Sequence, residues 1–240
     1  MKTRLDRLLV DRGLVESREK AQALIMAGEV LLNGQKAAKP GQAVGADANV
    51  EVLARPPYVS RGGFKLAAAL RHFAIDVPGQ VCLDIGSSTG GFTDALLQAG
   101  AARVHAVDVG AGQLAWALRT DPRVVLHEGL NARELTYAEI GEFVSLITCD
   151  VSFISVTLIL PAAVPLLQPA GRMVILIKPQ FEVGKGQVGK GGIVREPALH
   201  HAACERVEHA ARQLGFETNI MESPILGAEG NKEFLLYAHH

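Results

Sequence analysis

Cysteine, net charge and long apolar runs are all scarce in this 240-residue sequence, and each scarcity excludes a class of protein. The cysteines form no C-x-x-C pair or cluster, which predicts buried free thiols in a reducing compartment rather than disulfides; they are Cys82, Cys149 and Cys204. The longest apolar stretch, residues 156–167, contains two prolines and is too short to span a bilayer. The first residues lead into an amphipathic segment and not into the apolar core of a signal peptide. We therefore expect a soluble, cytoplasmic protein that does not enter a membrane.

The formal net charge of −1 excludes a protein coated with positive charge, but not one with a local basic patch. Residues 1–65 hold 11 Lys and Arg against 7 Asp and Glu, a net charge of +4, whereas residues 66–240 carry −5. A basic N-terminal part on an acidic body suggests a polyanion partner, although chance variation of the surface would give the same numbers. With 48% apolar and 20% charged residues, the chain is expected to fold.

The N-terminal part has the pattern of two short helices followed by a hairpin. A capping box at Thr3 predicts the first helix, and Ser17 is placed to cap a second helix that Gly28 ends. Asn33-Gly34 is a two-residue hairpin signal, and residues 49–53 have the pattern of a closing strand. Leucines at helical spacing would form the core of this unit. The basic side chains expected to stay exposed are Arg4, Arg18 and Lys20.

The run from Arg4 to Gln35 resembles the RNA-binding domain named after the fourth protein of the small ribosomal subunit. Domains of that family grip structured RNA through phosphates and shape, which suits basic side chains on a helix pair. The resemblance implies RNA contacts that we assign to Arg4, Arg18, Lys20 and Arg61. The residues alone would also allow an ordinary pair of surface helices with solvated charges.

The Pro-rich segment 54–58 marks the predicted boundary between a small domain, residues 1–58, and a larger domain, residues 59–240. Proline restricts both itself and the preceding residue, so we interpret the segment as a stiff linker. Its Pro-Pro-Tyr resembles a motif of amino-methyltransferases, but that motif follows the fourth strand of such a fold and here it precedes the fold.

Short apolar runs alternate with helical patterns from Val81 onward, which predicts a doubly wound parallel sheet of the α/β class. The expected strands are 81–85, 104–109, 124–127, 144–150 and 173–177. The expected helices are 92–99, 114–119, 158–167 and 198–214. Ligands of such sheets bind at the carboxyl ends of the strands, so the residues after each run are candidates for a site.

The residues at these strand ends predict a nucleoside cofactor. Asp108, at the end of the second run, could accept both hydroxyls of an adenosine ribose, and Asn131 could meet the adenine edge. Asp150 ends the fourth run. Each acid taken alone is more typical of a helix cap, but the occurrence of these residues at successive strand ends favours the cofactor. The first run leads into a turn whose candidate cofactor contacts are Asp84, Gly86, Ser87, Ser88, Gly90, Gly91 and Phe92.

Residues 184–190 match G-x-x-x-x-G-K, the beginning of a phosphate-binding loop, but Gly191 stands where Ser or Thr would bind magnesium. No helical pattern follows directly either. We interpret residues 180–195 as a basic, glycine-rich loop at the edge of the site, or as a plain connection. The sequence predicts no metal site.

Several long runs resemble the TlyA family, historically labelled haemolysin A: CLDIGSSTGGFTDALL, VDVGAGQLAWALR, DPRVVLHEGLNAREL, CDVSFIS and KPQFEVGKGQVGKGGIV. Members are S-adenosylmethionine-dependent ribose 2′-O-methyltransferases of ribosomal RNA with an FtsJ-like body. The resemblance implies a Rossmann-like sheet with an antiparallel seventh strand, S-adenosylmethionine as cofactor and cytidine as the modified nucleotide. Residues 86–92 would hold the methionine end of the cofactor, Asp108 the ribose and Asn131 the adenine side.

The TlyA family is similar to the wider group of 2′-O-methyltransferases with a Lys-Asp-Lys-Glu tetrad, and the matching positions are Lys65, Asp150, Lys178 and Glu233. A ribose hydroxyl must lose its proton as it attacks the methyl carbon. A lysine can take that proton only if its pKa falls well below the free value of about 10.4, and burial and a second ammonium both lower it. We therefore assign Lys178 as the general base, with the other three residues orienting and tuning it.

Three other functions are weighed against this assignment. A membrane-active haemolysin would need a long apolar or amphipathic segment, and none is evident. A non-catalytic RNA-binding factor of ribosome assembly would not need the tetrad. A base methyltransferase would need another catalytic motif after the fourth strand. Shorter TlyA members favour the large ribosomal subunit, and because the chain ends just past the last strand pattern, we expect a large-subunit substrate.

Overall fold

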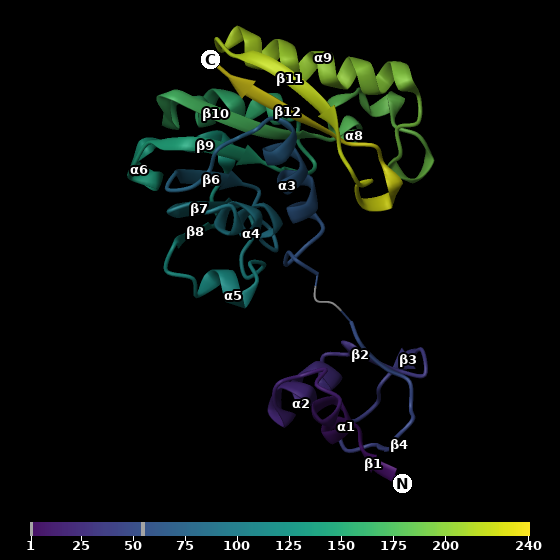
Figure 1. The fold of residues 1–240 in the computed structure, drawn as a ribbon. Helices are drawn as coiled ribbons and strands as arrows, with labels where there is room; N and C mark the ends of the chain where they lie inside the picture. Colours follow the sequence, from purple (N-terminus) through teal and green to yellow (C-terminus); the bar gives the residue numbers. More distant parts are fainter. Residues whose placement is uncertain (1, 54–55) are drawn as a thin grey trace. The chain divides into compact units, whose positions relative to one another are not determined.

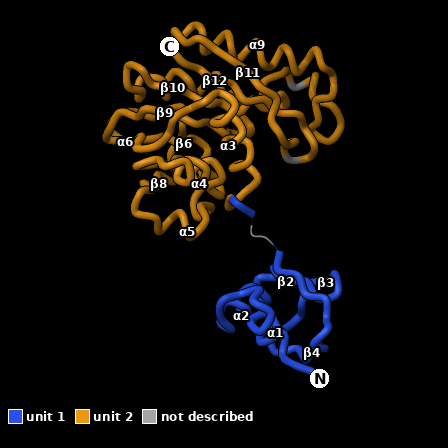
Figure 2. The backbone as a smooth tube through the Cα atoms, in the orientation of Figure 1, with its two compact units in different colours: residues 1–57 blue, residues 58–240 orange. Residues whose placement is uncertain are grey.

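The computed structural model describes residues 2–53 and 56–240, and the chain divides into two units, residues 1–57 and 58–240 (Figure 2). Ala54 and Arg55 of the predicted linker lie outside the described residues. The N-terminal unit has one hydrophobic core, and the larger unit, the body, has two.

The N-terminal unit consists of two short helices and two small antiparallel sheets. Its elements are β1 Lys2–Arg4, α1 Leu5–Asp11, α2 Arg18–Met26, β2 Val30–Leu32, β3 Gln35–Lys36, β4 Ala43–Gly45 and β5 Val50–Val52. β2 pairs with β3 and β5, and β1 pairs with β4. Leu5, Leu9 and Leu24 lie in the core between the helices, where the helical spacing predicts them.

Local signals determine the second helix and the hairpin. The Ser17 hydroxyl caps α2, and Gly28 follows the helix with φ +71°. Asn33 and Gly34 have φ of 52° and 81°, as a type I′ turn requires, so these predictions are confirmed. The capping box predicted at Thr3 is wrong. Thr3 is paired within β1, and α1 begins after it without a side-chain cap.

The body contains a seven-stranded sheet in the order β11-β12-β10-β9-β6-β7-β8 (Figure 1). Its strands are β6 Val81–Ile85, β7 Arg103–Asp108, β8 Val124–Glu128, β9 Val144–Cys149, β10 Leu167–Ile177, β11 Glu217–Glu222 and β12 Phe234–His239. β6 to β10 pair in parallel, and β12 is antiparallel to both of its neighbours. The α/β class and the antiparallel last strand are thereby confirmed.

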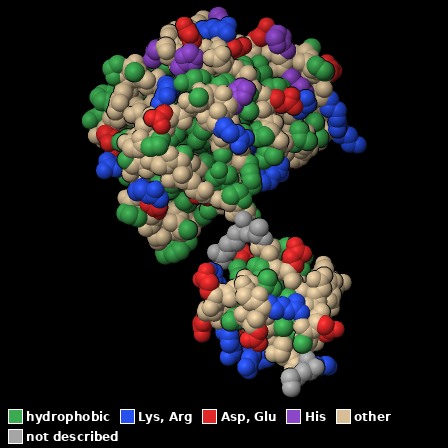
Figure 3. Space-filling model, viewed as in Figure 1, with side chains coloured by type: hydrophobic (Ala, Val, Ile, Leu, Met, Phe, Trp, Pro, Cys, Tyr) green, Lys and Arg blue, Asp and Glu red, His purple; other side chains and the backbone are tan. Residues whose placement is uncertain are grey.

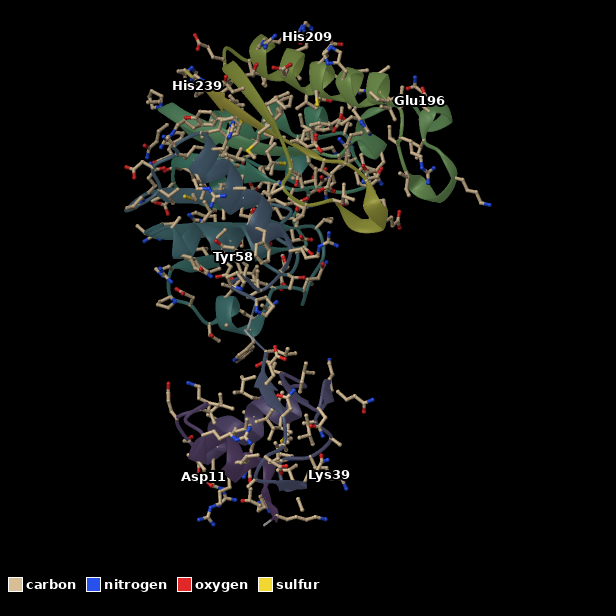
Figure 4. The ribbon with its side chains drawn as sticks, turned by 45° about the vertical axis from the view of Figure 1, so that its right-hand side comes forward. Asp11, Lys39, Tyr58, Glu196, His209 and His239 are labelled. Atoms are coloured by element: carbon tan, nitrogen blue, oxygen red, sulfur yellow. The ribbon has the colours of Figure 1, made fainter. Side chains whose placement is uncertain are left out.

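Helices cover both faces of this sheet (Figure 1). They are α3 Gly62–His72, α4 Gly91–Gln98, α5 Trp116–Arg119, α6 Tyr137–Ile140, α7 Leu160–Ala163, α8 Pro179–Glu182 and α9 Pro197–Gln213. One core joins α3 and α4 to the sheet, and the other joins α7 and α9. α9, which begins after Glu196 and carries His209, packs against β10, β11 and β12 (Figure 4).

Alternate residues of the central strands point into opposite cores. Cys82 and Leu146 belong to the α3–α4 core, whereas Leu83 and Ile147 belong to the α7–α9 core. Burial on both faces explains why these strands are continuous apolar runs in the sequence. All three cysteines of the chain are buried free thiols, as the sequence predicts.

The helix expected over residues 158–167 is interrupted. Pro161 and Pro165 lack the N–H groups that a continuous helix would use. The chain forms instead a 3-10 turn (Val156–Leu158), the short α7 and a second 3-10 turn (Val164–Leu166), after which Leu167 begins β10.

Candidate active site

A cavity of about 170 Å³ lies at the carboxyl ends of β6, β9 and β10, beside the first turn of α3. Lys65, Asp150 and Lys178, three members of the predicted tetrad, are among its lining residues. They come from three different elements, because parallel strands deliver the residues after their carboxyl ends to the same edge of the sheet.

Lys178 directly follows β10, and two side chains from the loop after the neighbouring strand β9 contact its ammonium group. Its Nζ lies 2.5 Å from Asp150 Oδ1 in an ion pair and donates a 2.8 Å hydrogen bond to Ser152 Oγ. The side chains of Lys178 and Asp150 are 13% and 22% exposed. The pair is therefore part of the cavity wall and remains accessible to a substrate.

Lys65 and Glu233 form a second, more deeply buried ion pair. Lys65, in α3, donates to Oε2 of Glu233, the residue just before β12. A Cβ on Gly227 would lie 2.1 Å from Oε1 of Glu233, so a larger residue at position 227 would displace this carboxylate. The structure thus brings the four tetrad positions together, three in the cavity lining and Glu233 through Lys65.

A larger cavity of about 520 Å³ adjoins the first and shares Gly86, Ser88, Asp150 and Ser152 with it. Asp108 and Asn131, which the sequence assigned to the ribose and the adenine, both line the larger cavity. A polar cavity that continues into a larger and more apolar one suits a nucleoside with a polar extension.

Asp108 and Asn131 also have local partners. Asp108 accepts 2.8 Å hydrogen bonds from the backbone N–H groups of Ser88 and Gly110, one on each carboxylate oxygen. Asn131 caps a 3-10 turn, because its Oδ1 accepts from the N–H of Arg133. Asn131 therefore both caps a 3-10 turn and lines the larger cavity. Asp108 lines the same cavity, and its hydrogen bonds to Ser88 and Gly110 order the glycine-rich turn.

Ser87 gives the smaller cavity an acceptor that the protein leaves unused. Its side chain is buried, and Oγ has no hydrogen-bond partner among residues 2–53 and 56–240. A buried hydroxyl without a partner costs free energy unless a ligand satisfies it. The ammonium or carboxylate of a methionine moiety would do so, and the residues present therefore fit the cofactor that the resemblance implies.

The glycines of the first turn are required by packing within the protein. A Cβ on Gly86, whose φ is +81°, would lie 2.3 Å from the backbone oxygen of Asp150. A Cβ on Gly90 would meet Leu118, and one on Gly91 would lie 2.2 Å from Ser60 Oγ. These contacts bring β6, β9 and α3 close enough to form one site. The sequence predicted close approach to a ligand, and it could not reveal these protein contacts.

Asp84 and Phe92 lie deeper than a direct cofactor contact requires. Asp84 is fully buried, outside the lining of both cavities, and accepts hydrogen bonds from Thr93 and Thr148. Burial raises the pKa of Asp84 to about 6, and the threonine hydrogen bonds oppose the shift. Phe92 lines the smaller cavity but is only 3% exposed and belongs to the α3–α4 core.

The predicted RNA contacts are exposed but already paired. Arg4 and Arg18 both bind the buried Asp6, at 2.8 and 3.3 Å, and Lys20 binds Glu16 at 3.0 Å. Hydrogen bonds from Arg4 hold the pKa of Asp6 well below its usual range despite burial. The two arginines thus stabilise the small unit, and about half of each side chain stays exposed.

Arg61 belongs to the body, unlike the other three predicted RNA contacts. Its guanidinium donates to the carbonyl of Leu226, in the loop before Glu233. On the face that Figure 3 shows, basic and acidic side chains are interspersed on both units. Each candidate RNA contact must therefore be tested singly.

The sequence reasoning missed two polar contacts beside the tetrad. Ser152 binds Lys178, and Glu182 of α8 accepts hydrogen bonds from Ser155 Oγ at 2.5 Å and from Val156 N–H at 2.8 Å. Burial raises the pKa of Glu182. Both residues lie in the quoted runs CDVSFIS and KPQFEVGKGQVGKGGIV, but nothing in the spacing indicates that these two runs touch.

No helix in the described part of the chain is long and apolar enough to cross a membrane. Among the same residues, no group of three or more His, Cys, Asp or Glu side chains could hold a metal ion.

Comparison with known families identifies the class of protein to which this chain belongs. The model of the FtsJ-like methyltransferases matches residues 58–240, and the model of the S4 domain matches residues 3–50. The chain therefore belongs to the FtsJ-like methyltransferases and carries an S4 domain, the RNA-binding module inferred from its first helices.

Individual relatives narrow the class to the TlyA family, to which this chain belongs. It is 48% identical to the 16S/23S rRNA (cytidine-2′-O)-methyltransferase TlyA of Mycobacterium tuberculosis, over 98% of this chain and 89% of that protein. It is 38% identical to the 23S rRNA (cytidine-2′-O)-methyltransferase TlyA of Campylobacter jejuni, over 95% and 96%. A solved structure from Streptococcus thermophilus, provisionally labelled a hemolysin, is 44% identical with a TM-score of 0.75, over 99% and 88%.

Proposed function

We propose that this protein transfers a methyl group from S-adenosylmethionine to the ribose 2′-oxygen of a cytidine in ribosomal RNA. The observation that carries the proposal is the meeting of two Lys–carboxylate pairs, Lys178–Asp150 and Lys65–Glu233, at one cavity. The names of its relatives, which are cytidine-2′-O-methyltransferases of rRNA, support the same chemistry.

The two adjoining cavities are the place for the cofactor. Asp108 and Asn131 would face its ribose and adenine, and the turn from Gly86 to Phe92, with the unpartnered Ser87 hydroxyl, would surround its methionine end. When bound, S-adenosylmethionine supplies a methyl group that its sulfonium has already made electrophilic.

Lys178 would accept the proton of the ribose hydroxyl. The new bond joins the 2′-oxygen to the methyl carbon while the methyl–sulfur bond breaks, and the proton passes to Nζ of Lys178. The ammonium that results lies beside the Asp150 carboxylate, which stabilises its charge. Lys65, held by Glu233, keeps a second positive charge near the same cavity.

The S4 domain supports a structured ribosomal RNA as the partner. We propose the large-subunit RNA in particular, because the names of both TlyA relatives include 23S rRNA. Such a reaction would take place in the cytoplasm, where bacterial ribosomes are assembled. Arg4, Arg18, Lys20 and Arg61 are the candidate contacts to that RNA.

Methylation of purified ribosomal RNA tests the proposal. The wild-type chain should place a 2′-O-methyl on a cytidine of 23S rRNA, and Lys178→Ala should reduce the rate by about a hundred- to ten-thousand-fold while cofactor binding stays near normal. Lys178→Arg should fail as well, because a guanidinium remains protonated. RNA binding without any methyl transfer by the wild-type chain would instead indicate a non-catalytic assembly factor.

A further inference from the structure

Ser152 makes one of the two polar contacts to Lys178 Nζ within the described residues, and Asp150 makes the other. We propose that Ser152 is a positioning residue which, together with Asp150, directs the lone pair of Lys178 toward the ribose hydroxyl. The proposal rests on the function proposed above, in which Lys178 accepts the proton of that hydroxyl.

The argument follows from the shape of a neutral amine, which has two N–H bonds and one lone pair in a tetrahedral arrangement. Ser152 Oγ, at 2.8 Å, accepts one N–H bond, whereas Asp150 Oδ1, 2.5 Å from Nζ, attracts the group as an ion-pair partner without hydrogen-bond geometry. The lone pair then occupies a remaining direction. All three side chains line the same cavity, so this direction is available to a substrate.

The ion pair with Asp150 alone would not orient the amine. With Asp150 only, the group could rotate about its Cε–Nζ bond without losing a hydrogen bond, so its two N–H bonds and its lone pair could exchange places. The acceptor at Ser152 distinguishes between these orientations. A hydroxyl serves this purpose without adding a second negative charge beside the base.

The backbone holds Ser152 in place relative to Lys178. The N–H of Asp150 binds the carbonyl of Ile85 at 2.9 Å, which fixes one end of the segment 150–156. The other end is fixed by Glu182, which accepts from Ser155 and Val156 and is only 4% exposed. Because Glu182 lies in α8, directly after Lys178, the same short stretch of chain carries the base and anchors the segment that orients it.

The role of Ser152 can be separated from folding because the residue is exposed and contributes nothing to either core. Ser152→Ala removes the acceptor and little else. Ser152→Thr keeps the hydroxyl. Ser145→Ala is the matched control, since Ser145 lies at the opposite end of β9, where its hydroxyl donates to Gln168 Oε1.

Single-turnover methylation of 23S rRNA by the full chain provides the test, together with calorimetric binding of S-adenosylhomocysteine. Ser152→Ala should lower the rate about three- to tenfold, as expected for the loss of one hydrogen bond to the neutral amine, with the affinities for cofactor and RNA unchanged. Ser152→Thr should recover most of the rate, and Ser145→Ala should keep it.

Each other outcome has one meaning. A wild-type rate for Ser152→Ala would overturn the positioning role and leave the proposed function intact. Equal losses in Ser152→Ala and Ser152→Thr would overturn it too, because the hydroxyl would then not be the group that matters. A wild-type chain that transfers no methyl group would refute the proposed function itself.

Discussion

Lys65 and Glu233 are 168 positions apart in the chain, yet they form an ion pair whose side chains are only 9% and 2% exposed. The pair joins α3, at the start of the body, to the residue before its last strand. A buried pair of this kind contributes little net stability, but breaking it leaves a largely buried charge without its partner.

Single and double substitutions of this pair should separate stability from catalysis. Lys65→Met and Glu233→Gln should each lower the free energy of unfolding by about 3–5 kcal/mol, because each leaves one buried group without its partner. The double variant should regain much of that loss. Urea unfolding of the wild type, the two single variants and the double variant measures this double-mutant cycle.

The double variant should regain stability without regaining methyl transfer. The double variant lacks the ammonium beside the cavity, so its rate should stay as low as that of Lys65→Met alone. A double variant that is both stable and fully active would mean that the pair is purely structural.

Gly227→Ala should reproduce part of this damage without touching a charged residue. The added Cβ would lie 2.1 Å from Glu233 Oε1, so the carboxylate must move away from Lys65. We expect a loss of activity of about tenfold or more, since misplaced catalytic groups cost rate steeply. Gly186→Ala is the matched control, because nothing lies within 4 Å of a Cβ at that position. Equal rates for the two alanine variants would contradict the geometry.

Lys20 offers the cleanest test of RNA binding by the S4 domain. Its pair with Glu16 is exposed on both sides, so Lys20→Ala should change stability by no more than about 1 kcal/mol. If Lys20 binds a phosphate, the slope of log affinity against log salt should fall by about one unit. Lys232→Ala removes a lysine of the body that is likewise paired with a glutamate at 3.0 Å, and it serves as the control.

Arg4 and Arg18 require a different interpretation. Because both bind the buried Asp6, their alanine variants should loosen the N-terminal unit as well as weaken RNA binding. A thermal unfolding curve must therefore accompany each affinity measured for them.

The parts of the fold that were predictable are those whose signal is local. The runs of β6 and β9 are apolar because both faces of the sheet are covered, and Asn33-Gly34 specifies its own turn. The tetrad positions were available from the resemblance, and the strand ends indicated where Asp108 and Asp150 would meet.

The parts that escaped prediction depend on contacts between distant segments. β1 and β4 are three residues each and too short for a periodic pattern. The convergence of Arg4 and Arg18 on Asp6 arises only once α1 and α2 pack together. The contacts of Ser152 and Glu182 likewise exist only because the segments after β9 and β10 lie side by side at the edge of the sheet.

Asp84 should make stability depend on pH in the direction opposite to an ion-paired carboxylate. Burial raises its pKa to about 6, above the value of about 3.9 in an unfolded chain. The contribution of Asp84 to the free energy of unfolding is fully present below pH 4 and is lost as the pH rises through 6, because ionisation is less favourable in the folded state. The loss is of order 3 kcal/mol, because a tenfold change in acidity between the folded and unfolded states corresponds to about 1.4 kcal/mol.

Asp84→Asn removes this titration and keeps a group that can accept from Thr93 or Thr148. Relative to wild type, the variant should gain stability steadily between pH 4 and pH 7, as measured by urea unfolding at several pH values. The exposed Asp76→Asn is the control and should follow the wild-type curve. Parallel curves for Asp84→Asn and wild type would show that Asp84 is already ionised at pH 4.

Asp108 should determine cofactor affinity through two effects at once. Its oxygens accept from Ser88 N–H and Gly110 N–H, and these bonds shape the turn that lines both cavities. Its remaining lone pairs face the place proposed for the ribose hydroxyls. Asp108→Asn keeps the size of the side chain but replaces one acceptor by a donor, which faces a backbone N–H that can only donate.

Calorimetry with S-adenosylhomocysteine should show affinity reduced by about tenfold or more for Asp108→Asn, since each unmatched buried polar group costs about 1–3 kcal/mol. Asp121→Asn, a change at the opposite end of β8, should bind normally. To separate the two effects, the dissociation constant of methionine can be measured by competition against S-adenosylhomocysteine. If Asp108 contacts the ribose, the dissociation constant of methionine should be similar in wild type and variant. If Asp108 acts only by shaping the turn, methionine should bind more weakly to the variant, and the direct ribose contact would be ruled out.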